Sequence, residues 1–197
     1  MSNQTFRILS FDPGLSTAGW NLSEYNPDNN IMLVRKYGML YPNKDVENAE
    51  HKNDSTKYGS RIMTLDALRT QLRELFNIFK PDFVVSEDAF FNPSRPIAYC
   101  ALVQWLTTLS LVLFDEYQQT LFRLAPKVVK QIASGVGTSD KDEIQTAILN
   151  KSDIKFDPPV VKEELTEHIC DSIGIGYTFI QEVLPSLLTI RSLFDNV

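Results

Sequence analysis

The sequence is poor in cysteine and lacks the signals of export. Its two cysteines, Cys100 and Cys170, are far apart in apolar surroundings. They offer no zinc-knuckle spacing and indicate buried, reduced thiols. We expect no apolar run to reach the roughly 18–20 residues of a membrane helix, so the chain is not expected to span a bilayer. The start, Met1 to Arg7, lacks a basic stretch followed by an apolar one, which predicts a cytoplasmic location.

Positive charge is in the minority, with 19 basic against 25 acidic residues and a formal net charge of −6. This balance argues weakly against non-specific binding to polyanions, although an acidic protein can carry a basic patch. The 197 residues are 43% hydrophobic and 22% charged, enough for one globular domain with a sizeable core and too few for two full α/β domains. Because no internal repeat or low-complexity tract divides the chain, we expect a single domain over 1–197.

The expected elements are three strands, then helices alternating with two further strands. Strands over 6–11, 19–23 and 31–41 with short connections predict an antiparallel meander, and a polar loop follows over 42–57. Apolar spacing and the positions of proline and glycine predict the remaining elements: helices over 58–79 and 96–116, strands over 83–86 and 120–124, helices over 126–134, 139–150 and 161–184, and a short extension over 185–197.

Two of the expected strands end in carboxylates. Asp12 closes the first strand, and an acidic residue there projects into the crevice where such sheets bind ligands. Gly14 lets the backbone approach a phosphate or a metal, although a simple Asp-Pro-Gly turn is an equal alternative. The strand over 83–86 is followed by Glu87 and Asp88, and only one of these can face the same crevice as Asp12. A solvated strand end is the alternative for this pair.

The late helix carries His168 and Asp171, which share one helical face. Charged residues within an apolar turn are costly unless they are paired or bound to metal, and a structural histidine is the alternative. Gly174 and Gly176 weaken a helix, which indicates close packing of this helix against the sheet. Carboxylates with an imidazole suit Mg²⁺ or Mn²⁺ better than structural zinc. Two such ions, about 3.5–4 Å apart, clamp a phosphodiester for in-line attack by water. The four candidate ligands are Asp12, Glu87, His168 and Asp171.

Three segments carry a specific resemblance: Ile8 to Gly14 followed by Gly19, Val84 to Glu87, and His168 to Gly174. In this order they resemble the motifs of the RuvC family of Holliday-junction resolvases, from about residue 6 to 181. The resemblance implies an α/β, ribonuclease H-like fold: a five-stranded mixed sheet, three strands antiparallel and then two parallel, flanked by helices. The loop over 42–57 is then an insertion, and 185–197 has no counterpart. The resemblance also implies that the four candidate ligands are catalytic and hold two Mg²⁺ ions, with Mn²⁺ as a substitute.

A basic segment over 121–141 contains four basic side chains against Asp140. A local charge of this kind is what a DNA-binding face needs, and a solvated helix face is the alternative. The resemblance implies that Lys130 and Lys141 lie near the scissile phosphate, Lys141 as a catalytic residue, and that Phe90 stacks on a base at the junction centre. Core packing is the alternative, and it is more strongly indicated for Phe91 than for Phe90. The predicted DNA-binding residues are Phe90, Arg123, Lys127, Lys130 and Lys141.

The resulting hypothesis is a metal-dependent endodeoxyribonuclease that resolves four-way or branched DNA by paired, symmetric nicks. Such nicks suit a homodimer, and the apolar helix over 96–116 supplies either a dimer face or part of the core. Another ribonuclease H-like nuclease acting on flaps or RNA–DNA hybrids is the alternative. A non-catalytic junction-binding scaffold is less favoured because all four ligand positions are filled. Actin-like ATPases and sugar kinases need a second domain that this chain lacks. The expected location is bacterial cytoplasm, or host cytoplasm for a phage-encoded protein, with an organelle as the alternative.

Overall fold

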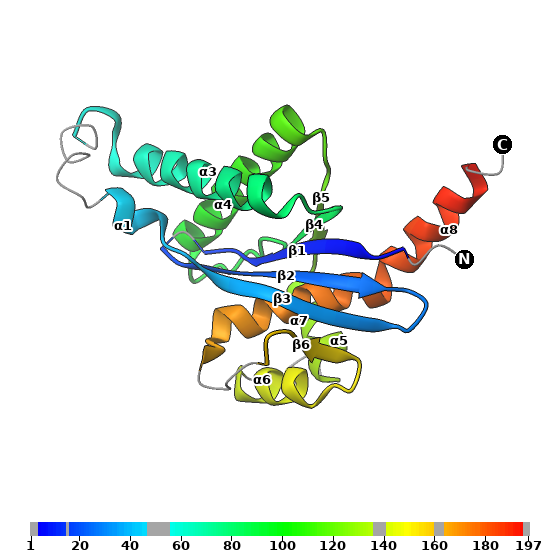
Figure 1. Ribbon diagram of the computed structural model, residues 1–197. Coiled ribbons are helices and arrows are strands. Elements are labelled where there is room, and N and C mark those ends of the chain that lie inside the picture. The colour runs from blue at the N-terminus through cyan, green and yellow to red at the C-terminus, as the bar shows by residue number, and fades with distance from the viewer. Residues whose placement is uncertain (1–3, 15, 47–55, 136–140, 160–163, 195–197) are drawn as a thin grey trace.

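A computed structural model of the chain describes residues 4–14, 16–46, 56–135, 141–159 and 164–194 (Figure 1). Its centre is a six-stranded sheet in the order β5-β4-β1-β2-β3-β6. β1, β2 and β3 pair antiparallel, whereas β4 and β5 continue the sheet in parallel beyond β1, and β6 pairs in parallel with β3. The strands are β1 (Phe6–Asp12), β2 (Ala18–Asn26), β3 (Ile31–Leu40), β4 (Phe83–Glu87), β5 (Leu121–Leu124) and β6 (Ile154–Phe156).

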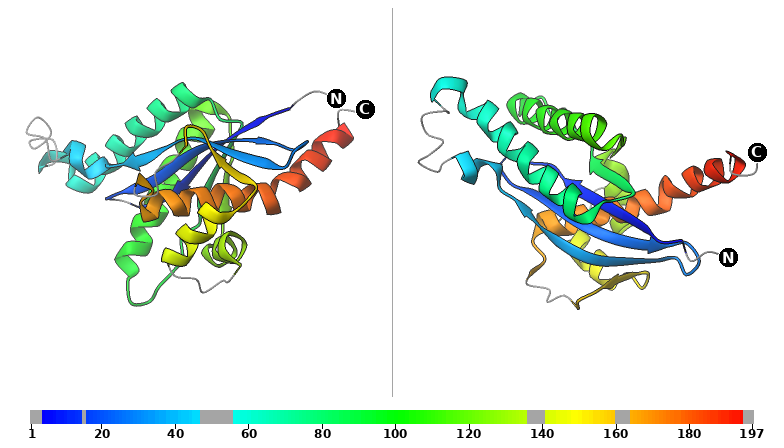
Figure 2. Two further views of the ribbon diagram at one scale, coloured as in Figure 1. Left: turned by 60° about the horizontal axis from the view of Figure 1, so that its bottom comes forward. Right: turned by 45° about the horizontal axis from the view of Figure 1, so that its top comes forward.

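Helices cover both faces of this sheet, with α3 and α4 on one side and α5, α6 and α7 on the other (Figures 1 and 2). Side chains alternate between the faces of a strand, so β1 contributes to both cores: Ile8 packs on the α7 side, and Leu9 and Phe11 pack on the α3 side. The helices are α1 (Pro42–Val46), α3 (Ser60–Phe79), α4 (Pro96–Val112) with a π-helical turn η1 (Leu113–Tyr117), α5 (Pro126–Ser134), α6 (Lys141–Asn150), α7 (Glu167–Glu182) and α8 (Leu184–Phe194).

The sheet has one strand more than expected. β6 lies within the segment 151–159, between the helices expected over 139–150 and 161–184, where the sequence predicts no strand. This strand has three residues, too few for an alternating pattern to be recognised. It forms because Ile154 is buried and its backbone pairs with Met32 on the edge of β3.

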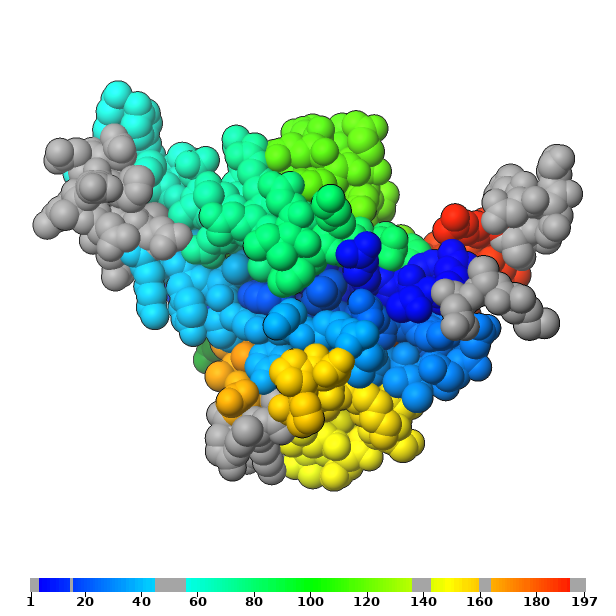
Figure 3. Space-filling model, viewed as in Figure 1, coloured from blue at the N-terminus to red at the C-terminus, as the bar shows by residue number. Residues whose placement is uncertain are grey.

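Three other expectations change at element ends. Pro42–Val46 is a short helix rather than loop, and 47–55 lie outside the described residues. α7 begins at Glu167 rather than near 161, where the Thr166 hydroxyl accepts a hydrogen bond from the Ile169 amide at 3.5 Å. The extension after 184 forms helix α8, which projects from the body of the molecule (Figure 3). Its second residue is Pro185, which suits the first turn of a helix.

The helix α4 with η1 corrects two expectations. Over Pro96–Tyr117 it has 22 residues and a window of mean hydropathy 1.8, long and apolar enough to cross a membrane by length and composition alone. Its core-facing residues are Trp105, Leu106, Leu109 and Val112, so the helix is also a packed part of this domain. Only 28% of the window is buried, and Cys100 is therefore exposed, whereas Cys170 is buried as expected. Helices α7 and α8 pass the same test together, but they are bent by 42° at their junction.

Candidate metal centre

The predicted ligands come together at the edge of the sheet where the neighbouring strands β1 and β4 have their carboxyl ends. β1 and β4 are parallel neighbours with Phe11 opposite Ser86, so the following residues, Asp12 and Glu87, end their strands side by side. The first turn of α7 crosses this edge and adds His168 and Asp171. The carboxyl end of a parallel pair is where such sheets place ligand-binding groups. Asp12, Glu87 and Asp171, which are 75 to 159 positions apart in the chain, are thus gathered in one place.

Burial and mutual repulsion dominate the electrostatics of the carboxylates. The pKa of Glu87 is raised to about 8, first by burial and then by the charges of Asp12 and Asp171. The pKa of Asp171 is raised to about 7 by burial, then by Asp12 and Glu167. Lys130 opposes both shifts. The site therefore has more negative charge than its surroundings compensate.

A hydrogen bond joins the imidazole to the first aspartate. His168 Nδ1 lies 2.5 Å from Asp12 Oδ2, with the histidine side chain 40% exposed and the aspartate 13%. This hydrogen bond is the main reason why the pKa of His168 is raised above its usual value, although burial opposes it. The protonated imidazole thus supplies part of the missing positive charge.

Glycines set how closely α7 approaches the sheet. Gly19 pairs with Asp12 across β1 and β2, and a Cβ built on Gly19 would lie 2.1 Å from the carbonyl oxygen of His168. A Cβ on Gly176 would lie 2.7 Å from Ser10 Oγ, which confirms close packing of this helix against the sheet. Gly174 instead faces α5, where its Cβ would be 3.3 Å from Ala133 Cβ. Any side chain at position 19 would push His168 away from Asp12.

The donor set fits a divalent cation. Within the described parts of the chain, no three His, Cys, Asp or Glu side chains lie close enough together to hold a metal ion as they stand. His168 Nδ1 contacts Asp12 Oδ2, an oxygen that a bound ion would need. Buried carboxylates with raised pKa values lose their protons when a cation binds, and oxygen ligands with one imidazole suit Mg²⁺ and Mn²⁺.

Comparison with known proteins places this geometry in context. No family model matches the chain. Curated relatives include the crossover junction endodeoxyribonuclease RuvC of Alkaliphilus oremlandii, 28% identical over 177 residues, covering 87% of this chain and 95% of the relative. The RuvC of Caldanaerobacter subterraneus is 26% identical over 168 residues, covering 83% and 90%. The chain is therefore similar in sequence to RuvC proteins over most of its length.

Solved structures support the same conclusion for the fold. Thermus thermophilus RuvC superposes with a TM-score of 0.64 at 16% identity, covering 89% of this chain and 92% of that one. The yeast mitochondrial Holliday junction resolvase gives a TM-score of 0.62 at 14% identity, covering 89% and 78%. The expected ribonuclease H-like fold is thereby confirmed, apart from the added strand.

The basic side chains of the predicted DNA-binding set differ in their relation to the carboxylates. Lys130 is half-buried and close enough to lower the pKa values of Glu87 and Asp171. Lys127 is exposed on the same helix. Arg123 instead forms an ion pair with Asp88 at 3.5 Å, which agrees with Asp88 facing away from Asp12. Lys141 begins α6, and its side chain lies outside the described residues.

Two phenylalanines follow Glu87 and both are exposed. Phe90 is 68% exposed and Phe91 is 55% exposed, so core packing is wrong for both. The ring of Phe91 makes an edge-on contact with Tyr99 at 5.3 Å between centroids. Phe90 therefore keeps an accessible aromatic face close in sequence to the catalytic candidates.

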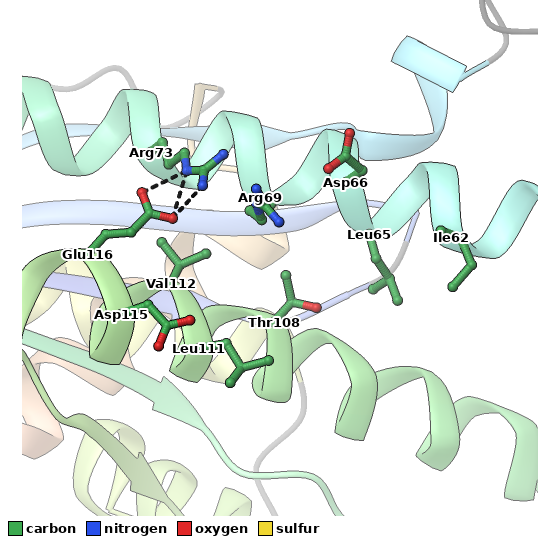
Figure 4. Close-up of a pocket in the computed structure, with 10 residues that line it drawn as sticks. All are labelled: Ile62, Leu65, Asp66, Arg69, Arg73, Thr108, Leu111, Val112, Asp115 and Glu116. Atoms are coloured by element: carbon green, nitrogen blue, oxygen red, sulfur yellow. Dashed lines mark hydrogen bonds and ion pairs between the residues drawn. The ribbon is translucent and has the colours of Figure 1, made fainter. Parts of the chain in front are cut away.

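A cavity of about 360 Å³ lies elsewhere, between α3 and α4 (Figure 4). Its wall includes the ion pair of Arg73 with Glu116, in which Arg73 Nη2 lies 2.5 Å from Glu116 Oε1, marked by dashed lines in Figure 4. The described residues that line it include none of the predicted ligands or DNA-binding residues. The carboxylate cluster lies instead at the carboxyl ends of β1 and β4, as expected for a site that must admit DNA.

Proposed function

We propose that this chain is a metal-dependent endodeoxyribonuclease that cuts four-way or branched DNA junctions. The observation that carries the proposal is the gathering of Asp12, Glu87 and Asp171 at one sheet edge beside Lys130. The curated relatives are named crossover junction endodeoxyribonucleases. Structures with similar folds include Thermus thermophilus RuvC in complex with a Holliday junction substrate and a fowlpox virus resolvase in complex with junction DNA.

The chemistry follows from the charges of the site. Asp12, Glu87 and Asp171 would hold two Mg²⁺ ions, or Mn²⁺ in their place, and His168 would add a neutral ligand. Bound ions would stabilise charge on the phosphate and lower the pKa of the attacking water. The carboxylates hold and orient these ions, and the ammonium of Lys130 attracts the phosphate toward the same edge. Binding requires His168 to release Asp12, which gives imidazole protonation a direct effect on metal affinity.

Contacts with DNA would come from the basic residues and one aromatic side chain. Lys127, Lys130 and Lys141 would neutralise phosphates, which makes binding salt-dependent. Arg123 would join them after exchanging Asp88 for a phosphate. Phe90 would stack on an unpaired base, a contact worth about 1–3 kcal/mol.

We also propose a homodimer, because paired nicks in strands of like polarity need two sites related by a two-fold axis. The exposed face of α4 and η1 is the candidate interface. It carries large apolar side chains at Ile97, Val103, Leu111 and Phe114. Phe114→Glu should convert a dimer into monomers in sedimentation velocity without unfolding the domain, whereas a wild-type chain that sediments as a monomer would contradict the proposal.

The decisive experiment compares nicking of a synthetic four-way junction with nicking of a linear duplex, a flap and an RNA–DNA hybrid in Mg²⁺. We expect cleavage of the four-way junction and none of the linear duplex. Asp12→Asn serves as the matched control for contaminating nucleases. Junction binding without nicking would favour a scaffold, and preferential cutting of flaps or hybrids would favour another ribonuclease H-like activity. ATP turnover would favour a kinase-like protein.

A further inference from the structure

A buried polar network lies directly beneath the carboxylates. Four fully buried side chains form it: Ser10 on β1, Asn21 and Ser23 on β2, and Ser172 on α7. We call this group the Asn21 network. A protein of this size could fill the space with apolar side chains, since buried polar groups are costly unless every one is hydrogen-bonded. Their presence between sheet and helix therefore calls for a physical explanation.

Asn21 is the centre of the network and uses both ends of its amide. Its Nδ2 donates to Ser10 Oγ at 2.5 Å and lies 3.5 Å from Ser172 Oγ. Its Oδ1 accepts a hydrogen bond from Ser23 Oγ at 2.6 Å. The hydroxyl of Ser172 donates to the carbonyl of Ile169 at 2.7 Å, which leaves its oxygen free to face the amide. Both N–H groups and the carbonyl oxygen of the Asn21 amide thus face partners within the network, as an asparagine amide allows.

The network connects the two backbone segments that carry the aspartates. Ser10 is two residues before Asp12 on β1, and Ser172 directly follows Asp171 on α7. Asn21 lies opposite Ser10 in the β1–β2 register. The amide of Asn21 therefore reaches both segments. Ser10 is 11 positions from Asn21 in the chain, and Ser172 is 151 positions away.

The same stripe of α7 is fixed at three successive turns. Positions 168, 172 and 176 are four apart and so lie on one face of the helix. At the ends of this stripe, the backbone of His168 contacts Gly19 and Gly176 contacts Ser10, both without room for a side chain. Ser172 lies between them over Asn21. The contacts at Gly19 and Gly176 set how closely α7 approaches the sheet. Between them, the amide of Asn21 forms the polar contact with the helix.

We infer that Asn21 is a positioning residue for the metal centre: its amide joins the β1 segment that carries Asp12 to the α7 segment that carries Asp171. The inference rests on the proposed metal-dependent function. Repulsion among the carboxylates acts to separate β1 from α7, and the Asn21 network opposes that separation from below. Groups that orient metal ligands without touching the ion change metal affinity or activity by about 10- to 100-fold when they are replaced.

The test is a Mn²⁺ titration of the full chain followed by electron paramagnetic resonance, with junction binding in EDTA measured alongside. Asn21→Leu keeps the volume but removes the amide, and Ser172→Ala removes only the partner on the helix. We expect both to weaken Mn²⁺ binding, the former by about 10-fold, with junction affinity in EDTA unchanged. Ser172→Ala alone decides the question if Asn21→Leu does not fold.

Thr178→Val is the matched control. Thr178 is a fully buried hydroxyl on the same helix, and it donates to the Gly174 carbonyl within α7 at 2.8 Å. Its replacement should lower the melting temperature and leave Mn²⁺ affinity unchanged. Wild-type Mn²⁺ affinity in Ser172→Ala, or an equal loss in Thr178→Val, would overturn the inference. A wild-type chain that binds Mn²⁺ but cuts no junction would instead overturn the proposed function alone.

Discussion

Replacing Glu87 by glutamine should stabilise the metal-free protein while abolishing nicking. The pKa of Glu87 is about 8 in the folded chain, because the side chain is buried and faces Asp12 and Asp171, against an ordinary value of 4.5. Between these values the folded state binds a proton that the unfolded state has released. Stability therefore falls as the pH rises through this window. Asp171, with a pKa of about 7 against 3.8, has the same sign.

The size of the effect follows from the difference between the two pKa values. At 1.36 kcal/mol per pKa unit, a rise from 4.5 to about 8 costs up to about 5 kcal/mol at high pH. Because Asp12 and Asp171 share the same repulsion, not all of this cost is relieved by changing Glu87 alone. We expect the neutral side chain of Glu87→Gln to increase the free energy of unfolding by about 2–4 kcal/mol at pH 8. Even about 2 kcal/mol would raise the melting temperature by roughly 4–8 °C in a domain of this length.

The assay is thermal unfolding in EDTA at pH 5 and pH 8. Glu87→Gln should melt well above the wild type at pH 8 and close to it at pH 5, where the wild-type carboxyl is protonated when folded. Adding Mg²⁺ at pH 8 should stabilise the wild type more than the variant, because the carboxylate then has a cation to bind. Asp88→Asn is the control, since the side chain of this neighbouring carboxylate is 44% exposed and paired with Arg123.

Two results would refute this reasoning. If Glu87→Gln and the wild type lose stability equally between pH 5 and pH 8, the carboxyl of Glu87 does not carry the repulsion. If Asp88→Asn reproduces the gain at pH 8, the effect comes from net charge and not from the buried cluster.

The remaining predictions concern the roles of single side chains. Asp12→Asn and Asp171→Asn should each abolish nicking of a four-way junction while gel-shift affinity survives, since lysine–phosphate contacts supply the affinity. Phe90→Ala should slow junction cleavage with little change in melting temperature, because the ring is 68% exposed and a buried phenylalanine would cost about 3–5 kcal/mol. In nicking assays against pH, activity should fall on acidification as His168 is protonated. At low metal concentration this fall should begin above the usual imidazole pKa, because the hydrogen bond to Asp12 raises the pKa of His168. Higher metal concentration should move this loss to lower pH. We also expect a preference for Mn²⁺ over Mg²⁺, because imidazole suits Mn²⁺ better, and His168→Asp should reduce both effects.

Most of the fold could be predicted because its signals are local. Asp12-Pro13-Gly14 ends one strand, Lys80-Pro81 ends one helix, and apolar residues repeat at helical spacing between them. β6 could not be found in this way, because a strand of three residues depends on pairing with the edge of β3. The exposure of Cys100 was missed for a similar reason, since composition shows that α4 is apolar and does not show which side is covered.

The ligands of the candidate site could be predicted from the sequence, whereas the residues that hold α7 against the sheet could not. Carboxylates at strand ends are visible in sequence, and His168 and Asp171 lie at a helical spacing. The close approach of Gly19 to the His168 backbone joins segments that no local pattern connects. Asn21 and Ser172 likewise read as ordinary polar residues until the fold brings them within 3.5 Å of each other.

In the absence of a cation, repulsion among the ligands acts to separate α7 from the sheet, and the glycine contacts and the Asn21 network oppose that separation. Three carboxylates from β1, β4 and α7 repel one another, and separating the helix from the sheet would relieve that repulsion. The glycine contacts and the Asn21 network keep the helix in place, so the repulsion instead raises the pKa values of Glu87 and Asp171. The energy held in this way is released when a divalent cation displaces the protons. A rigid attachment beneath a repulsive cluster therefore increases affinity for the ion, and the same attachment lowers the stability of the metal-free protein.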